Sequence, residues 1–264
     1  SRSEDGRFYG VGHFDLIIVD EAHRSIYNKY QTIFEYFDGL FLGLTATPKG
    51  SIDHNTYDVF GLAKDNPTDA YDFDEAVAQK FLSPYKVHDV PVKFLRKGIK
   101  YSELSEEDKL KFEDEFLEGR KASGDEHIQK TELGKWLFNK PTAIKALSYF
   151  LKHGIKVNGG DEIGKTIIFA RTQKHAEFLR DVLLEMDREQ FGNKYVKVIT
   201  NQTPKAQTFI ERFCEDKKDL LPQIAISVDM MDTGIDAPKV VNLIFYKPVK
   251  SYSKFWQMIG RGSR

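Results

Sequence analysis

The chain has 264 residues, of which 41% are hydrophobic and 30% are charged, a composition typical of globular proteins that excludes disordered and collagen-like classes. Lys and Arg number 39 against 40 Asp and Glu, so the formal net charge of −1 excludes a polybasic tail protein but not local nucleic-acid binding. The single cysteine, Cys214, excludes an internal disulfide and a cysteine metal cluster and favours a reducing, cytoplasmic location. The apolar runs are far shorter than a membrane span, so we expect no membrane association.

Two short apolar runs near the N-terminus are predicted to be buried strands. They cover residues 14–19 and 41–46, and Pro48 and Gly50 end the second. Between them, apolar residues recur at intervals of three or four, which predicts a helix around residues 30–37. We assign residues 1–70 to a first α/β domain.

The middle of the chain, residues 71–140, is predicted to be a linker or insert that contains helices. Residues 101–126 carry ten acidic side chains against four basic ones, with apolar residues between them. This pattern predicts amphipathic helices with a solvated acidic face, and we favour it over an acidic interaction patch.

From residue 141 to residue 264, strands and helices alternate regularly. Thr172 is a predicted N-cap, and Thr203 followed by Pro204 predicts the cap and first position of another helix. The alternation predicts a parallel sheet covered by helices, and therefore a second α/β domain. The predicted strands are 166–170, 195–200, 223–228 and 240–245, and the predicted helices are 141–153, 172–186, 203–215 and 251–257.

Acidic and hydroxyl side chains follow the two N-terminal strands. The sequence Asp20-Glu21-Ala22-His23 follows the first strand, and Thr45-Ala46-Thr47-Pro48 follows the second. Ligands of α/β sheets bind at the carboxyl ends of the strands, where one carboxylate could hold Mg²⁺ and its neighbour could orient or deprotonate a water. The threonine hydroxyls could bridge the acidic pair to a neighbouring group. An ordinary acidic loop and a simple strand-to-loop cap are the alternatives.

Basic and small residues gather in the last part of the chain. Residues 239–264 contain six basic side chains and no acidic one, which suits a phosphate-facing surface. Arg261 and Arg264 have the planar, permanently charged fork that binds phosphate oxygens bidentately. Before them, Gly234 permits an unusual backbone angle, and Asp236 could hold the arginine-bearing loop. A basic surface turn is the alternative.

The ordered segments DEAH, TATP, TIIFART, SVDMMDTGID and QMIGRGSR resemble motifs II to VI of superfamily 2 helicases and translocases. That family has two RecA-like domains, with ATP in the cleft between them and nucleic acid across the top. The resemblance implies two RecA-like parallel-sheet domains, the first one incomplete, joined by an inserted, mostly helical acidic segment. Residues 1–70 would hold the DEAH and TAT motifs, and residues 141–264 would hold motifs IV, V and VI.

The resemblance also implies a role for each matching residue. Asp20 would coordinate Mg²⁺, and Glu21 would activate the hydrolytic water. For Arg171, a structural ion pair is the alternative to contact with nucleic acid or nucleotide. The other implied roles are ATP-site contacts by His23, Gly234, Asp236 and Gln257, γ-phosphate contacts by Arg261 and Arg264, and coupling to nucleic acid by Thr45 and Thr47. The residues themselves suggest nucleic-acid contacts at three more positions, because Ser227 and Thr233 offer donors to a phosphate and Arg171 could contact nucleic acid or nucleotide.

A narrower resemblance links the chain to the motor (R, or HsdR-type) subunit of type I restriction enzymes. It rests on the stretches DEAHRSIYNKY, YDFDEAVAQKFLSPYKV and KPVKSYSKFWQMIGRGSR. It implies an ATP- and Mg²⁺-dependent motor that pulls double-stranded DNA, with modification and specificity subunits as partners. Another superfamily 2 member, a repair or RNA helicase, is the alternative.

The segment from Gly159 to Thr166 matches the phosphate-loop pattern G-x-x-x-x-G-K-[ST]. A working phosphate loop opens a helix, whereas a strand is predicted here, so we interpret the match as coincidental. The chain would then be a fragment without motif I, inactive alone although its parent hydrolyses ATP. A non-hydrolysing nucleic-acid-binding module is one alternative, and a phosphate-loop kinase or NTPase built on Lys165 is another, if a helix follows.

Overall fold

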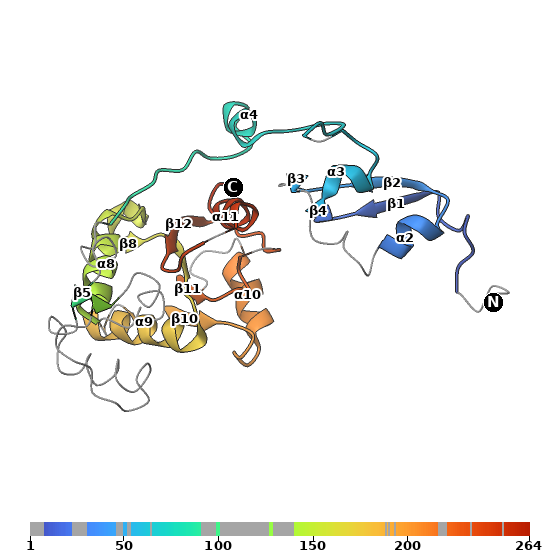
Figure 1. Cartoon of the computed structure of the whole chain (residues 1–264). Helices are drawn as coiled ribbons and strands as arrows, with labels where there is room; N and C mark the ends of the chain where they lie inside the picture. The colour runs from blue at the N-terminus through green and yellow to red at the C-terminus, as the bar shows by residue number, and fades with distance from the viewer. Residues whose placement is uncertain are drawn as a thin grey trace. The chain divides into compact units, whose positions relative to one another are not determined.

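The chain divides into two compact units (Figure 1). The N-terminal unit comprises Ser1–Gln79 and Ser251–Trp256, and the C-terminal unit comprises Lys80–Lys250 and Gln257–Arg264. The computed structural model describes residues 8–22, 31–45, 50–51, 54–63, 65–90, 99–100, 127–128, 140–187, 189, 191–192, 194–215, 221–232, 234–249 and 251–264. The predicted acidic helices at 101–126 lie outside these ranges.

A two-stranded parallel sheet lies at the centre of the N-terminal unit. β1 (Leu16–Val19) pairs with β2 (Leu40–Gly43), and the helix α2 (Gln31–Tyr36) lies between them in the sequence. The two strands and the helix therefore form where the sequence predicts them, with shorter bounds. The remaining elements of this unit are β3 (Gly50–Ser51), β4 (His54–Asn55), α3 (Thr56–Val59) and α4 (Phe73–Ala78).

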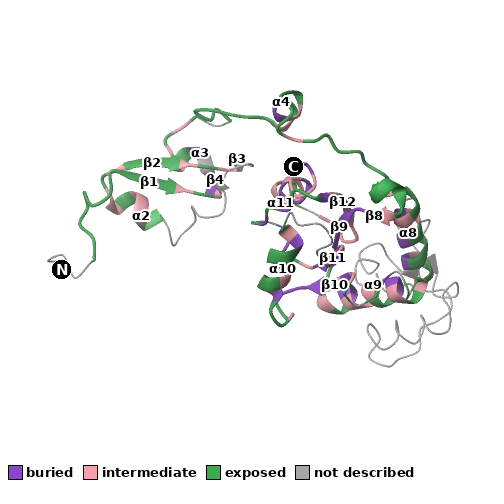
Figure 2. Cartoon of the chain, turned by 180° about the vertical axis from the view of Figure 1, so that it is seen from behind, coloured by how far each residue is buried: buried purple, intermediate pink, exposed green. Residues whose placement is uncertain are grey.

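The prediction that both N-terminal strands are buried is wrong for one face of this sheet. Exposed residues alternate with half-buried ones along β1 and β2 (Figure 2). The side chain of Leu40 is 74% exposed. The other face packs on aromatic rings, where Phe34 of α2 stacks on Phe41 at a centroid distance of 4.6 Å. Because side chains alternate between the faces of a strand, covering one face leaves every second residue exposed. The exposed apolar residues are Leu16, Ile18, Leu40 and Leu42.

The C-terminal unit contains a four-stranded parallel sheet in the order β10-β11-β9-β12. This arrangement confirms the predicted α/β class with a helix-covered parallel sheet. Its strands are β9 (Lys165–Phe169), β10 (Val196–Ile199), β11 (Ile224–Ser227) and β12 (Val240–Phe245). Its helices are α8 (Lys140–His153), α9 (Gln173–Met186) and α10 (Ala206–Cys214), and α11 (Tyr252–Ile259) continues into it. Two small antiparallel pairs join β5 (Ile99–Lys100) to β6 (His127–Ile128) and β7 (Lys156–Val157) to β8 (Glu162–Ile163).

The core of this unit has two halves, one on each face of the sheet. Ile168 and Ala170 pack with buried residues of α8 and α9, whereas Ile167 and Phe169 pack with α10 and with Met258 of α11. All five residues of β9 are buried. A central strand covered on both faces explains its continuous apolar run, because neither face meets water.

The two predicted helix starts have different outcomes. The Thr172 hydroxyl accepts a hydrogen bond of 3.2 Å from the His175 N–H, so Thr172 is the N-cap of α9, as predicted. Thr203 does not cap a helix, because α10 begins at Ala206 after Lys205, which has a left-handed φ of 57°.

The Thr203 hydroxyl is used in the turn that follows β10. It donates to the Val198 carbonyl at 3.2 Å and accepts from the Thr200 N–H at 3.0 Å. A side chain occupied by the preceding strand is unavailable to the helix that follows, which explains why the predicted capping pattern fails here.

In the described part of the chain, we find no helix with the length and hydropathy needed to cross a membrane.

Candidate functional site

In the N-terminal unit, the acidic segment that follows β1 lies beside the threonine segment that follows β2. Asp20 follows β1 and Thr45 follows β2 by two residues, so both lie at the carboxyl edge of the parallel sheet. The Leu44 N–H donates to the Val19 carbonyl, and the Ala22 N–H donates to the Leu44 carbonyl, each at 2.9 Å. These bonds hold the acidic turn beside the threonine segment. His23 and Thr47 lie outside the described residues.

The acidic turn has an unusual backbone at Glu21. Its φ is +49°, in the left-handed region, and its N–H donates to the Asp20 carboxylate at 2.8 Å. A non-glycine residue in this region costs about 1–3 kcal/mol and is found preferentially at functional sites. The next residue, Ala22, is fully buried, while the Asp20 side chain is exposed. The turn is thus anchored on one side and open to a ligand on the other.

The donor set of this turn fits Mg²⁺ bound together with phosphates. Carboxylate oxygen is the ligand type that Mg²⁺ prefers, and the ion commonly takes one or two carboxylates with substrate phosphates and water. Within the described ranges, no group of three or more His, Cys, Asp or Glu side chains gathers to hold a metal. Asp20 could supply one ligand to such an ion.

In the C-terminal unit, both predicted arginines contact the segment that follows Gly234. Arg261 donates from Nη1 to the Ile235 carbonyl and from Nε to the Gln257 carbonyl, the latter at 3.1 Å. Arg264 Nη1 lies 2.6 Å from Asp236 Oδ1. Gly234 has a φ of +75°, where a side chain would be strained. The arginine loop and the glycine segment therefore form one connected cluster.

The arginine loop, residues 257–264, combines buried residues that support it with charged side chains that are open to solvent. Gln257 is 5% exposed and Ser263 is 1% exposed, and the Ser263 carbonyl accepts a hydrogen bond of 2.6 Å from the Ser83 N–H. The Arg264 and Asp236 side chains, in contrast, are 45% and 70% exposed. An incoming anion therefore has access to Arg264 but not to the buried residues that support the loop.

Ser227 and Arg171 both lie at the carboxyl edge of the C-terminal sheet, but in different environments. Ser227 ends β11 and is fully buried, so its hydroxyl is enclosed within this unit. Arg171, two residues beyond β9, is exposed, and its N–H donates to His175 Nδ1 at 3.2 Å. Arg171 is thus presented to solvent, whereas Ser227 is not. Thr233 lies outside the described residues.

A further polar residue of this unit was missed by the sequence analysis. Lys247 was counted only as part of the basic stretch, but its side chain is 9% exposed and lies 3.1 Å from Asp232. The signal that could have found it is its place directly after a buried strand, at the sheet edge where the motif residues gather.

The phosphate-loop match does not form a phosphate loop. The match leads into a strand, as predicted, and not into a helix: the strand was predicted from Thr166, and β9 begins one residue earlier, at Lys165. Its side chain is buried, with Nζ 5.0 Å from the centroid of the Phe213 ring. Gly159 and Gly160 belong to the 3₁₀ turn η2 (Asn158–Gly160), between β7 and β8. Without a helix N-terminus, no row of free N–H groups is available to hold phosphates, which removes the alternative of an NTPase built on Lys165.

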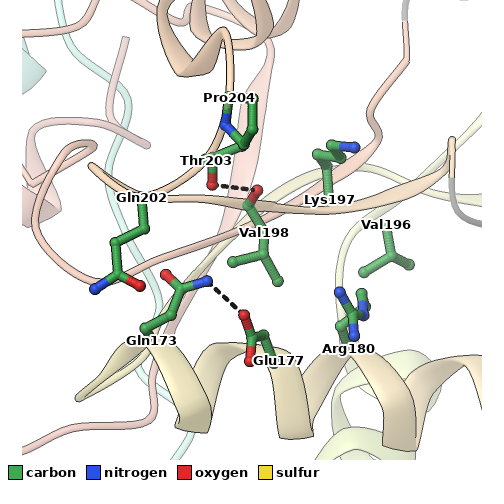
Figure 3. A pocket seen from close by; sticks show the side chains of 9 residues that line it. All are labelled: Gln173, Glu177, Arg180, Val196, Lys197, Val198, Gln202, Thr203 and Pro204. Atoms are coloured by element: carbon green, nitrogen blue, oxygen red, sulfur yellow. Dashed lines mark hydrogen bonds between the residues drawn. The ribbon is translucent and has the colours of Figure 1, made fainter.

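A groove of about 420 Å³ runs between α9 and the edge strand β10 (Figure 3). Gln173 donates to Glu177 at 2.6 Å, and Arg180 is paired with Asp181 at 2.7 Å. Each of these three lining side chains has a polar partner, and the lining contains none of the predicted site residues. The lining residues are Gln173, Glu177, Arg180, Val196, Lys197, Val198, Gln202, Thr203 and Pro204.

Two family profiles match the chain. The profile described as "Type III restriction enzyme, res subunit" matches residues 4–50, and the profile described as "Helicase conserved C-terminal domain" matches residues 144–264. The first covers the acidic turn and β2, and the second covers the four-stranded sheet and the arginine loop.

Curated relatives include endonuclease subunits of type I restriction enzymes. The chain is 30% identical over 259 residues to the EcoAI endonuclease subunit of Escherichia coli, covering 95% of this chain and 30% of that protein. It is 27% identical to the EcoKI endonuclease subunit of Escherichia coli K12, covering 96% of this chain and 23% of that protein. The chain therefore spans less than a third of the length of these relatives.

Solved structures include a fragment, from Vibrio vulnificus YJ016, assigned as an HsdR subunit of a type I restriction enzyme. It matches with a TM-score of 0.69 and 28% identity, covering 97% of this chain and 41% of that one. The type ISP restriction-modification enzyme LlaBIII bound to DNA matches with a TM-score of 0.52 and 19% identity, covering 95% of this chain and 17% of that one, which shows the shared fold alone.

Proposed function

We propose that this chain is a superfamily 2 helicase-type segment, similar to the R subunits of type I restriction enzymes, and that it is part of an ATP-hydrolysing motor that moves along double-stranded DNA. The observation that carries the proposal is the pair of half-sites. The acidic turn joins two strand ends in one unit, and two arginines join the Gly234 segment in the other. Neither half suffices for phosphoryl transfer, which needs both a positioned water and neutralised phosphate charge.

The acidic half-site would supply the water activation. The Glu21 carboxylate would accept a proton from the attacking water, and Asp20 would hold Mg²⁺, which neutralises phosphate charge when bound. The two adjacent carboxylates extend from a backbone turn that is left-handed at Glu21. The neighbouring Thr45 would connect this turn to the nucleic-acid grip.

The arginine half-site would stabilise charge on the γ-phosphate in the transition state. The Arg264 side chain is 45% exposed, and its planar fork could exchange the Asp236 carboxylate for phosphate oxygens. We propose that the acidic turn and the two arginines both act on ATP, and that hydrolysis alters the contacts with DNA made by Arg171 and the Gly234 segment. The proposed partners are double-stranded DNA and the modification and specificity subunits, by similarity to the restriction enzymes above.

The test is ATP turnover by the full-length product of the natural gene, with and without linear duplex DNA. We expect DNA to stimulate turnover at least tenfold. Glu21→Gln should lower turnover about 10²–10⁴-fold, the contribution typical of a general base, while ATP binding persists. Asp15→Asn, at an exposed carboxylate before β1, is the matched control and should leave turnover unchanged. Turnover that is insensitive to DNA would disprove the motor proposal.

A further inference from the structure

Lys247 is a nearly buried cation in the C-terminal unit. Its side chain is 9% exposed, two residues beyond the end of β12. Burying an ammonium group is unfavourable unless it is paired and hydrogen-bonded. The structure supplies these partners, because Nζ donates to the Val228 carbonyl and lies 3.1 Å from Asp232 Oδ2 and 3.6 Å from Asp229 Oδ1.

These contacts join two strand ends that are not neighbours in the sheet. Lys247 follows β12 and Val228 follows β11, and β9 lies between these two strands. Nζ lies 5.9 Å from the ring centroid of Phe169, the last residue of β9. The lysine therefore reaches across the end of β9, along its terminal aromatic ring, and joins the C-terminal ends of β11 and β12.

The segment tied by Lys247 leads directly to the arginine cluster. Asp232 is two residues before Gly234, and the next two residues contact Arg261 and Arg264. Residues 228–236 are thus held at both ends by basic side chains. Lys247 holds the beginning through a buried pair, in which Asp232 is only 3% exposed, while Arg264 holds the end through an exposed one.

We propose that Lys247 is a positioning residue that sets the path of residues 228–236 and, through Ile235 and Asp236, the place of Arg261 and Arg264. This inference rests on the proposed function, because it assigns Lys247 to the support of the arginine half-site. The buried pair is stiff and screened from water, whereas the exposed pair can open when a phosphate arrives. Lys247 would then keep the segment in place while Arg264 exchanges partners.

The variants must separate positioning from stability. Lys247→Met alone leaves the Asp232 carboxylate buried beside an apolar side chain and is expected to lower the melting temperature. The double variant Asp232→Asn with Lys247→Met removes both charges together, so it should melt close to the wild type. Lys156→Met, at an exposed lysine of β7 in the same unit, is the control for loss of one positive charge.

Two measurements on the full-length protein test the proposal. In the folded double variant, kcat for DNA-stimulated ATP turnover should fall at least tenfold with KM for ATP changed less than twofold, because the arginines act on the transition state. Amide hydrogen exchange followed by mass spectrometry should quicken in residues 228–236 and 257–264 but not in β9. The Lys156→Met control should match the wild type in both measurements.

A double variant with wild-type kcat, or with exchange increased equally throughout the unit, would overturn the positioning role. If the wild-type protein has no DNA-dependent turnover, the proposed function fails. The exchange measurement still decides whether Lys247 orders the segment, so the two failures are distinguishable.

Discussion

Arg264 is joined to Asp236 by an ion pair of 2.6 Å, which links the arginine loop to the segment after Gly234. Both side chains are largely exposed, so the pair contributes only about 0–1 kcal/mol to folding. The pair matters instead for position, because it joins Arg264 to the segment that Arg261 also contacts. A contact that is weak for stability can still decide where a charge-stabilising side chain lies.

We therefore expect substitutions in this pair to change activity far more than stability. In the full-length protein, Arg264→Ala should lower ATP turnover about 10³-fold or more, the magnitude found for arginines that stabilise phosphoryl transfer. Asp236→Asn should lower it less, because the arginine itself remains. Melting temperatures should stay within about 3 °C, since a change of 1 kcal/mol corresponds to about 2–4 °C in a domain of this size. Arg212→Ala, at an exposed arginine of α10, is the control, and equal losses in it and in Arg264→Ala would refute the assignment.

Lys165 provides a test of the phosphate-loop match. Lys165→Met keeps the length of the side chain and its packing against Phe213 while removing the ammonium group. We expect the affinity for a fluorescent ATP analogue to change less than twofold, measured by titration of the full-length protein, because the lysine is buried at the start of β9. A tenfold or larger loss of affinity in a variant with wild-type circular dichroism would restore the phosphate-loop interpretation.

The cap of α9 predicts a local effect on stability. Thr172→Ala removes the acceptor of the His175 N–H and should lower the free energy of unfolding by about 1 kcal/mol, measured by urea denaturation followed by circular dichroism. Thr172→Ser keeps the hydroxyl and should retain most of the stability. Thr208→Ala, at an exposed position within α10, is the comparison, and an equal loss there would show that the cap contributes nothing specific.

The buried phenol of Tyr246 should make the protein less stable at alkaline pH. Burial raises the pKa of its phenol from 10.0 to about 12. The Tyr246 phenol ionises near pH 10 in the unfolded chain and only near pH 12 in the folded chain. Its stabilising contribution is therefore complete below pH 10 and is lost as the pH rises toward 12. This rise in the pKa corresponds to about 2–3 kcal/mol of unfolding free energy.

Tyr246→Phe should therefore flatten the fall in unfolding free energy between pH 10 and pH 12, measured by urea denaturation at a series of pH values. Tyr149→Phe, at a partly exposed tyrosine of α8, is the comparison and should keep the wild-type slope. An unchanged slope in Tyr246→Phe would contradict the raised pKa.

Much of the local structure could be predicted because it depends on residues close together in the chain. The bounds of β12 match the prediction, and Thr172 caps α9 through a bond to a residue three positions away. The strand after the phosphate-loop match was predicted in the same way, from the apolar run that begins at Thr166. The order of the motifs in the sequence also indicates the resemblance to superfamily 2 helicases and translocases.

The structure alone decided features that depend on distant residues. The exposed faces of β1 and β2 follow from which side of that sheet receives α2 and Phe60, which an apolar run does not encode. Thr203 failed as a cap because its hydroxyl bonds to the preceding strand. Lys247 is similar, because its partners at residues 228–232 lie 15 to 19 positions away. They meet it only in the folded sheet, where β9 lies between β11 and β12.

For this protein, the sequence by itself determined the strand and helix pattern, the two acidic residues and two arginines, and the resemblance to helicase-type motors. Only the tertiary structure decided which of these side chains are buried, which are open to a ligand, and what holds each in place. The physical reason is the distance along the chain over which each kind of interaction acts. Periodicity and capping are set within one or two turns of chain, whereas burial and ion pairing are set by whichever distant segment folds against the residue.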